Sequence, residues 1–317
     1  MVSLPDRELM YRAVLEHNRQ NNLGLDPDDF EIVKKVREEM GREKDPTGDR
    51  LKVFEKATEV VLDPTLPLIL RLDGRAFHSY TKQFDRPFDE RLHRFMVNTM
   101  LALAEEANAR YCYTQSDEIT LVCLCEGKAQ PLFGGRVQKL TSLMASYAGA
   151  FFNLAVVSGL NRAPARLATF DCRAYTVPDK ATAAEVVLWR EADAIRNSTL
   201  GRGQEFLSPK NLHGMSARDV REWLRNEGKA WGGLEDKRKF GVAYQRKTVS
   251  RPFTCAEIVQ LPEKHAARTN PDLTVQRQDF VEVTLPLRWR CSNPEAVIFD
   301  GADEALFDGE LADQELR

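Results

Sequence analysis

The stretch PLILRLDG at residues 67–74, together with YCYTQSDEITLVCLC at residues 111–125, decides the fold. In the first, a run of branched apolar residues ends in Asp73 and Gly74, which is typical of a buried strand that stops at a turn. The second contains two short apolar runs separated by Gln-Ser-Asp-Glu, which predicts a β-hairpin with Asp117 at its tip. Each acidic stretch therefore lies at the end of a predicted strand.

Two helix-length segments separate the predicted strands. Residues 88–108 have apolar side chains at helical spacing, with Asp89 and Glu90 in the first turn, where acids stabilise a helix. Residues 136–156 repeat this pattern, and residues 167–172 return as a strand. The order strand, helix, strand, strand, helix, strand is that of the ferredoxin-like (βαββαβ) unit. We therefore expect an α+β fold with helical and extended additions.

In such a unit the first and third strands are antiparallel neighbours, which brings two distant acids together. Asp73 ends the first strand and Asp117 begins the third, so their backbones should lie about 5 Å apart. Two carboxylates, with a Gly74 carbonyl unhindered by a Cβ, offer the hard oxygen ligands that Mg²⁺ prefers. Two ions roughly 3.5–4 Å apart would fit this pair. Glu118 should point to the other face of its strand. Alternatively, Asp-Gly is an ordinary turn and Ser-Asp an ordinary hairpin tip.

Basic side chains around the predicted acidic edge favour the metal hypothesis. Several cations near two carboxylates fit a bound triphosphate with its magnesium, and a helix N-terminus also favours anions. The alternative interpretation of each basic residue, taken singly, is that it is a solvated surface side chain. The bases near this edge in the predicted fold, with one histidine, are Arg71, Arg75, His78, Lys82, Arg86, Arg136 and Lys139.

Composition and charge limit the class of protein. With 317 residues, 43% of them hydrophobic and 29% charged, the chain has enough core for one large domain or two ordinary ones. No apolar run approaches the roughly 18 residues needed to span a bilayer, and the N-terminus lacks an apolar signal core. We therefore expect a cytoplasmic protein with no membrane partner. The six cysteines include no Cys-x-x-Cys pair, which favours buried thiols over disulfides or metal ligands.

The net charge of −3 gives no overall attraction to nucleic acid, but bases gather at residues 236–251. There they are interleaved with aromatic residues, a pattern that can bind phosphates and stack bases. A solvated surface strand is the alternative. The candidate binding residues of this basic strip are Lys237, Arg238, Lys239, Tyr244, Arg246 and Lys247.

Four regions follow along the chain. Residues 1–43 predict a helical N-terminal extension, and a polar segment with Pro46 predicts a linker at residues 41–48. Residues 44–178 would form the catalytic unit. Residues 179–299 predict helical and extended additions, including a helix at 181–197 and another at 216–226 that Ser216 would cap. Residues 300–317 form an acidic tail.

Two motifs point to one family. RLDGRAFH at residues 71–78, followed by ARYCYTQSDE at residues 109–118, closely resembles the tRNA-histidine guanylyltransferase family, the reverse-direction (3′-to-5′) nucleotide polymerases. WREAD at residues 189–193 and YQRKT at residues 244–248 are further similarities. The resemblance extends over residues 45–250.

The resemblance implies a polymerase-type palm on which Asp73, Asp117 and the Gly74 carbonyl bind two Mg²⁺ ions. The nucleotide-binding residues it implies are Arg71, Arg75, Ala76, Phe77, His78 and Ser116. Those that would hold phosphates or the tRNA 5′ end are Lys82, Arg86, Arg136, Lys139 and Asn197. Family members activate a tRNA 5′-monophosphate with ATP, and the 3′-hydroxyl of GTP then attacks it. They commonly form homotetramers, and residues 179–299 with their basic strip would contribute to tRNA binding.

The segment after WREAD distinguishes branches of the family. It reads AIRNS at residues 194–198, where eukaryotic members have Cys-His-Ile-Asn-Asn with a histidine tied to the anticodon. The chain is therefore more similar to the bacterial and archaeal guanylyltransferase-like branch, which repairs truncated tRNA 5′ ends. We expect a Mg²⁺-dependent nucleotidyltransferase acting on tRNA 5′ ends. The alternatives are a nucleotide cyclase with the same palm and a non-catalytic RNA-binding module.

Overall fold

The computed structural model describes residues 46–125, 131–161, 164–270 and 272–306. The chain divides into two units, Met1–Glu59 and Val60–Arg317. The described part of the first unit contains helix α3 (Pro46–Lys56). The expected linker at residues 41–48 is therefore wrong in its second half. Pro46 begins this helix, and proline suits the first turn because the missing N–H has no partner there. The predicted extension at 1–43, and the tail beyond residue 306, lie outside the described residues.

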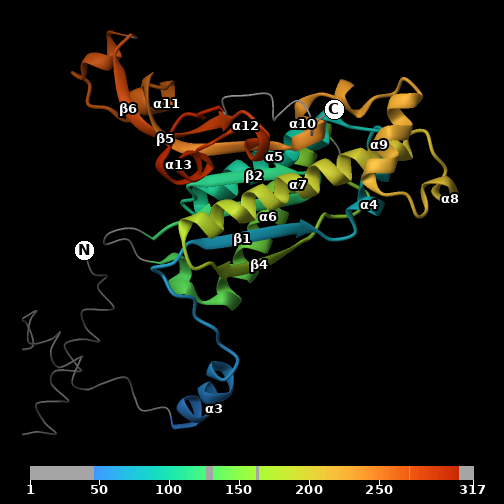
Figure 1. The fold of residues 1–317 in the computed structure, drawn as a ribbon. Coiled ribbons are helices and arrows are strands. Elements are labelled where there is room, and N and C mark those ends of the chain that lie inside the picture. The colour runs from blue at the N-terminus through green and yellow to red at the C-terminus, as the bar shows by residue number, and fades with distance from the viewer. Residues whose placement is uncertain (1–45, 126–130, 162–163, 271, 307–317) are drawn as a thin grey trace, which may run out of the picture. The chain divides into compact units, whose positions relative to one another are not determined.

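Six strands of the second unit form one sheet with the order β4-β1-β3-β2-β5-β6 (Figure 1). Every pairing between neighbouring strands is antiparallel. β1 lies between β3 and β4, and its antiparallel pairing with β3 is the one expected from the sequence. The strands are β1 (Leu68–Gly74), β2 (Tyr111–Gln115), β3 (Glu118–Cys123), β4 (Phe170–Thr176), β5 (Val242–Pro252) and β6 (Thr274–Val283).

Helices cover both faces of this sheet (Figure 1). The long ones are α5 (Glu90–Glu106), α6 (Val137–Leu160), α7 (Lys180–Gln204) and α9 (Ala217–Asn226). Ser216 caps α9 as expected. The short helices are α4 (Phe77–Tyr80), α8 (Pro209–Leu212), α10 (Asp236–Phe240), α11 (Cys255–Gln260), α12 (Leu287–Arg290) and α13 (Pro294–Asp300). Single 3-10 turns are η1 (Thr81–Gln83), η2 (Leu132–Gly135), η3 (Trp231–Gly233) and η4 (Ala266–Arg268).

The alternation of side chains along β1 explains the two layers. Leu70 and Leu72 are fully buried in a core that they share with α5 and α6. Ile69 belongs to a second core, which contains residues of α7, α9 and α13. Because successive residues of a strand point to opposite faces, Arg71 and Asp73 share the α7 side with Ile69. β1 thus presents apolar side chains to one layer and charged ones to the other.

Helix α6 is long and apolar enough to cross a bilayer, which corrects the expectation that no such run exists. One side of the helix is nevertheless part of the core between α5 and the sheet. The fully buried residues of that side recur every four positions and are Leu140, Met144, Ala148, Phe152 and Val156. A core helix of a large sheet layer passes the same test of length and composition, so this apolar run has a structural explanation.

The six cysteines are all free thiols, as expected, and Cys112, Cys123 and Cys291 are buried. Burial raises the pKa of the Cys123 thiol to about 12. The three buried cysteines are therefore inert packing residues rather than nucleophiles.

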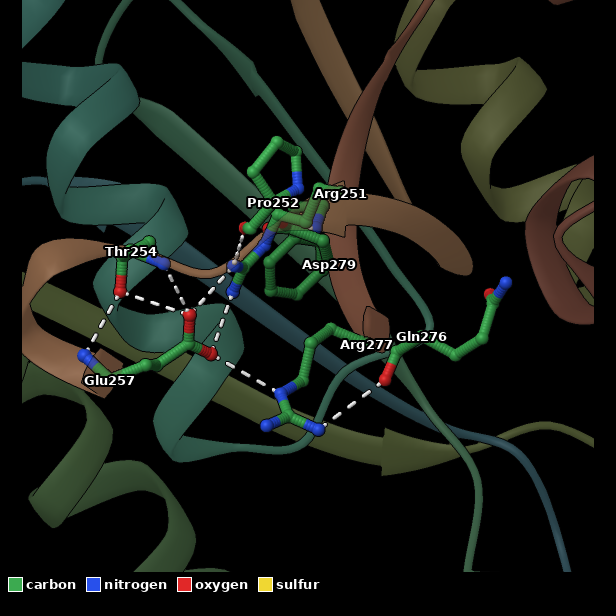
Figure 2. Close-up of polar contacts among 8 residues, drawn as sticks. Arg251, Pro252, Thr254, Glu257, Gln276, Arg277 and Asp279 are labelled. Carbon is green, nitrogen blue, oxygen red and sulfur yellow. Dashed lines mark hydrogen bonds and ion pairs between the residues drawn. The ribbon is translucent and has the colours of Figure 1, made fainter. Parts of the chain in front are cut away.

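The basic stretch at residues 236–251 is a helix followed by a strand. Its first part forms α10, which ends at Gly241 with a φ of 81°, and β5 begins only at Val242. β5 and β6 then continue together beyond the pairing of β5 with β2. Figure 2 shows Glu257 of α11 between two arginines of this arm. Arg251 donates to both Glu257 carboxylate oxygens at 2.8 and 3.1 Å, and Arg277 donates at 3.2 Å, which fastens α11 to both strands.

Candidate nucleotide and metal site

Asp73 and Asp117 meet at the edge of the sheet where β1 ends. Asp73 is the register partner of Glu118, the first residue of β3. The Gly74 N–H donates to the main-chain carbonyl of Asp117 at 3.1 Å. Ser116 adopts a left-handed φ of 54° in the hairpin turn, and its hydroxyl donates to the Asp117 carboxylate at 2.9 Å. The structure therefore brings together the two acids that the strand order predicts to be neighbours.

This acidic edge has uncompensated negative charge. Burial raises the pKa of the Asp117 carboxyl, the Ser116 hydrogen bond opposes this, and the charge of Asp73 raises it further. In the part of the chain that the structure describes, neither Asp73 nor Asp117 forms an ion pair with a lysine or arginine. Two neighbouring carboxylates repel each other, and a cation between them relieves that repulsion. Their oxygens, with the adjacent Gly74 carbonyl, suit a divalent ion such as Mg²⁺.

Among the described residues, no group of three or more His, Cys, Asp or Glu side chains has metal-binding geometry. An ion at Asp73 and Asp117 would therefore need main-chain, water or substrate oxygens to complete its coordination. Mg²⁺ sites of phosphoryl-transfer enzymes have this composition, because one or two carboxylates combine with substrate phosphates.

The turn after β1 is closely packed and leads directly into α4. A Cβ on Gly74 would lie 2.3 Å from the Phe77 ring. The Phe77 ring is itself buried, in contact with the rings of Tyr80, Phe152 and Phe170. Ala76 is exposed and left-handed, with a φ of 54°, and its carbonyl accepts the N–H groups of Ser79 and Tyr80 in α4. Of the predicted nucleotide-binding residues, Ala76 and Phe77 can therefore contribute mainly backbone groups.

A pocket of about 680 Å³ opens beside Asp117. Small-molecule sites typically occupy about 300–1,000 Å³, so this pocket has room for a nucleotide. The wall nearest the acidic edge includes His78, Arg86, Ser116 and Asp117. Further lining residues are Ser198, Gly201, Arg202 and Gln204 of α7, Glu205 directly after it, and Lys237 and Arg238 of α10. Several residues predicted separately thus surround one nucleotide-sized space.

Glu118 is not part of the pocket lining and instead anchors α7 to β3. Arg190 donates to both Glu118 carboxylate oxygens at 2.6 and 2.7 Å, and to Asp193 at 2.8 Å. Its guanidinium lies 4.4 Å from the centroid of the Trp189 ring. Only 8% of the Arg190 side chain is exposed, so this bidentate ion pair is a largely buried connection between the sheet and the helix.

Other predicted residues lie around the acidic edge without joining the pocket. Arg71 is on the α7 face of β1, two residues before Asp73. Arg75 and Lys82 are exposed in the turn after β1 and in η1. Asn197 is exposed on α7, and its amide donates to Asp193 at 3.4 Å.

The structure does not bring Arg136 and Lys139 to the acidic edge of the same chain. Arg136 forms a β-bridge with Val61, and the preceding Gly135 lines a small cavity together with Leu68, the first residue of β1. Because a strand rises about 3.3 Å per residue, the opposite ends of β1 are about 20 Å apart. The start of α6 is therefore at the far end of the strand from Asp73.

The bases of the basic strip are already paired with acids of the chain. Tyr244 also donates its hydroxyl to Glu282 at 3.3 Å. A phosphate of a nucleic acid would have to displace these carboxylates or bind a base that keeps its acidic partner. The ion pairs are Lys237 with Glu90 and Glu235, Arg238 with Glu205, Lys239 with Asp236, Arg246 with Glu105, and Lys247 with Asp303.

Sequence reasoning assigned no role to Arg190, Glu191 or Arg202 on α7. Glu191 is fully buried, and its carboxylate accepts the N–H groups of Leu287 and Arg288 at 3.2 and 3.1 Å. Burial raises the pKa of Glu191 to about 7, against these two hydrogen bonds. Arg202 lines the pocket and pairs with Glu205. One feature of the sequence could have indicated these roles. The WREAD segment has three charged residues in a helix that also has to pack on a sheet.

A carboxylate pair at a sheet edge, beside a pocket of nucleotide size, is the arrangement of enzymes that transfer phosphoryl or nucleotidyl groups with divalent cations. The family model of tRNAHis guanylyltransferase (Thg1) matches residues 48–178. A bacterial tRNAHis guanylyltransferase (Thg1)-like protein in complex with ATP is 32% identical, with a TM-score of 0.59 over 63% of this chain and 87% of that chain. The GTP complex of such a bacterial protein is 31% identical, with a TM-score of 0.56 over 65% of this chain and 86% of that chain.

Curated proteins agree with this match. The tRNA(His) guanylyltransferase of Debaryomyces hansenii is 29% identical over 245 residues, which are 73% of this chain and 86% of its own. The uncharacterized protein R259 of Acanthamoeba polyphaga mimivirus is also similar, at 28% identity over 232 residues, or 65% of this chain and 78% of its own. The chain belongs to the tRNAHis guanylyltransferase family, whose named members are nucleotidyltransferases.

Proposed function

We propose that the protein is a Mg²⁺-dependent nucleotidyltransferase that adds nucleotides to the 5′ end of tRNA in the 3′-to-5′ direction. The main support is the Asp73–Asp117 pair, which has no basic partner in the described chain and lies beside a pocket large enough for a nucleotide. The ATP and GTP complexes of the bacterial relative support nucleoside triphosphates as substrates. The tRNA substrate is inferred from the family.

We also propose that the part of the chain from β1 to β4, with α5 and α6, is a ferredoxin-like palm of the polymerase type. The order β4-β1-β3-β2 and the two helices on one face support this assignment. In a palm the reacting groups lie on the sheet edge and the helices form its back. The acidic edge where Asp73 meets Asp117 has that position.

The reaction consists mostly of positioning and charge neutralisation. Two Mg²⁺ ions held by Asp73, Asp117 and the Gly74 carbonyl would neutralise phosphate charge and polarise the phosphorus centre. Arg86 and His78, from the pocket wall, would orient the nucleotide so that its 3′-hydroxyl lies in line with the activated 5′-phosphate of tRNA. No nucleophilic side chain is required for such a transfer.

We propose that the natural substrates include 5′-truncated tRNAs other than histidine tRNA. The anticodon-linked histidine of eukaryotic members corresponds by position to Ile195 here. Ile195 is 4% exposed and packs in the core of the α7 layer, so this position contributes no polar group to recognition. From the same family resemblance we propose a homotetramer.

The two alternative functions are a nucleotide cyclase and an RNA-binding module without catalysis. A cyclase needs a nucleotide pocket but no place for RNA, whereas Lys237 and Arg238 line this pocket. A module without catalysis would have no use for two unneutralised carboxylates, which cost stability.

One assay separates these functions. Labelled 5′-truncated tRNAs of several identities are incubated with Mg²⁺ and single nucleoside triphosphates, and the products are resolved by size. We expect 5′ extension, and an Asp117→Asn variant should be slower by about 10²–10³-fold or more because charge neutralisation is lost. Its unfolding temperature should not fall, since a buried carboxylate becomes neutral. Cyclic nucleotide as the product would support the cyclase, and strict preference for histidine tRNA would overturn the repair proposal.

A further inference from the structure

Two segments that are distant in the chain are joined beside the nucleotide-sized pocket. One is the start of α5 with the preceding Phe88, and the other is α10. Phe88, Lys237 and Arg238 all line the pocket. Lys237 forms an ion pair with Glu90, the first residue of α5, and the Arg238 guanidinium lies 5.3 Å from the centroid of the Phe88 ring. Side chains of α10 therefore hold the two segments together.

The two contacts differ in how firmly they are held. Arg238 also pairs with Glu205 at 2.9 Å, and only 21% and 14% of these two side chains are exposed. Glu205 in turn pairs with Arg202, so Arg238 is fixed to the end of α7. In the pair of Lys237 with Glu90, by contrast, 32% and 60% of the side chains are exposed. Ion pairs with such exposure contribute little to stability, so this is the contact that opens most easily.

Lys237 keeps a second acid when it leaves Glu90. Its ammonium group lies 3.0 Å from the carboxylate of Glu235, which directly precedes α10. Glu90 is the stronger partner of the two, because its hydrogen bond raises the pKa of Lys237 more than that of Glu235 does. Since Glu235 remains beside the lysine, separating α10 from α5 does not leave the charge of Lys237 uncompensated.

We propose that Phe88, Glu90, Lys237 and Arg238 form a clasp that controls the exchange of nucleotide in this pocket, and that RNA opens the clasp. The ion pair holds the rim of the pocket narrow, and a nucleoside triphosphate enters or leaves when the pair breaks. Phosphates of an RNA backbone compete with Glu90 for Lys237, because a polyanion attracts lysines whatever its sequence. This control by RNA rests on the proposed function, whereas the exchange of nucleotide requires no turnover.

A clasp has a kinetic signature that direct binding lacks. Glu90 is not among the residues that line the pocket. Loss of its charge therefore changes how often the pocket opens and not the contacts that a bound nucleotide makes. The association and dissociation rates rise together, and their ratio, the Kd, stays the same. A residue that binds the nucleotide directly would change the Kd instead.

Stopped-flow fluorescence with a labelled, non-hydrolysable nucleoside triphosphate in Mg²⁺ measures both rates. Glu90→Gln keeps the length of the side chain and removes the charge that holds Lys237. We expect both rates to rise about two- to fivefold, the change that corresponds to an exposed ion pair, with the Kd unchanged. Glu235→Gln is the matched control. It removes an acid from the same lysine but no link to α5, so both rates should stay as in wild type.

An RNA hairpin with a 5′-phosphate provides the second arm of the experiment. In wild type the hairpin should raise both rates toward those of Glu90→Gln. It should add little to Glu90→Gln, in which the clasp is already open. In Lys237→Met the hairpin should also have little effect, because the base that RNA takes from Glu90 is absent. Unfolding temperatures equal to that of wild type show that the variants keep the fold.

Each outcome decides one part of the proposal. Equal rates in wild type, Glu90→Gln and Glu235→Gln overturn the clasp, and so does a change of the Kd that accounts for the faster dissociation of Glu90→Gln. If Glu90→Gln exchanges nucleotide faster but the hairpin does not act on wild type, the control by RNA is overturned. If both arms give the expected rates while labelled tRNA is not extended, the proposed function fails and the clasp stands.

Discussion

Gly74 shows how little space surrounds the acidic edge. It is the residue between the Asp73 carboxylate and the buried Phe77 ring, and its N–H is bonded to Asp117. The Cβ of any other residue here would lie 2.3 Å from the Phe77 ring. It would therefore displace the ring and the turn that positions both acids. Packing against the Phe77 ring therefore requires glycine here.

Gly74→Ala should lower the free energy of unfolding by about 1–3 kcal/mol, the usual cost of overpacking. Urea unfolding of both proteins measures this. Gly149→Ala is the matched control, because a Cβ there meets only a carbonyl oxygen at 3.8 Å. Since alanine is the better helix former, Gly149→Ala should be neutral or stabilising by up to about 1 kcal/mol. Equal stability of Gly74→Ala and wild type would contradict the packing argument.

The acids of the site were predictable, but most of their partners were not. Asp73 lies at the end of one strongly apolar strand, and Asp117 directly precedes another. The local pattern and the strand order were therefore sufficient to place both acids. The partner of Glu118 is Arg190, which is 72 residues away in the chain. No local pattern reports such a contact.

At the level of elements, α7 connects the sheet with the C-terminal helices. Arg190 joins it to β3, and Glu191, the next residue, joins it to the start of α12. Both connections are buried and charged, so each is costly to break. The position of the pocket wall formed by residues 198–205 depends on them.

Glu118→Gln should destabilise the protein by about 2–3 kcal/mol, because it leaves the buried Arg190 guanidinium without its bidentate carboxylate. Chemical denaturation measures the change. Arg196→Ala removes an ion pair from the same network, but that side chain is 63% exposed, so the cost should stay below about 1 kcal/mol. If both variants lost similar amounts of stability, the ion pair between Arg190 and Glu118 would contribute little to the free energy of unfolding.

Glu191 predicts a specific dependence of stability on pH. Its pKa is about 7 in the folded protein, above the ordinary value of 4.5, so the folded state binds the proton more tightly. Its contribution is therefore fully present below pH 4.5 and is lost as pH rises through 7. The loss amounts to at most about 3 kcal/mol.

Glu191→Gln should flatten that part of the profile. The measurement is the free energy of unfolding of both proteins between pH 5 and pH 8. We expect the difference between wild type and variant to change across this range, with wild type relatively weaker at high pH. A difference that stays constant would mean that Glu191 does not titrate there.

The periodicity of the sequence predicted which residues form strands and helices. It did not by itself predict at which edge of the sheet a helix begins. The start of α6 was expected beside the phosphates because a helix N-terminus favours anions. It lies instead near Leu68, since α6 runs back along the strand from the far end. Likewise residues 236–240 are a helix, whereas the alternative interpretation of the basic strip was a solvated surface strand. The strand order itself requires this position of α6, because β3 begins at the acidic edge and the chain enters α6 from its other end.

At the scale of the whole molecule, α6 has an outer apolar stripe that the described chain leaves exposed. Phe151, Leu154 and Val157 are 37%, 65% and 41% exposed. A helix that is apolar on all sides is normally covered on all sides. In the proposed homotetramer, a second copy of the chain would cover this stripe.

Leu154→Glu should therefore reduce the mass of the particle in solution, measured by light scattering during size-exclusion chromatography. The charge would lie in an apolar contact between copies without touching the core of one chain. Ser146→Glu, at an exposed polar position of the same helix, is the control and should not change the mass. The same mass for Leu154→Glu and wild type would exclude this stripe as the interface.

The β1–β3–β4 arrangement also sets the order in which a newly made chain can assemble. β1 leaves the ribosome first but pairs only with strands that begin at Glu118 and Phe170, and Glu118 then waits for Arg190. Contacts between such distant segments form slowly, because a long loop must close before each one. Until then the apolar β1 is unprotected during synthesis. Cells that make this protein must shield an early strand until its late partners emerge.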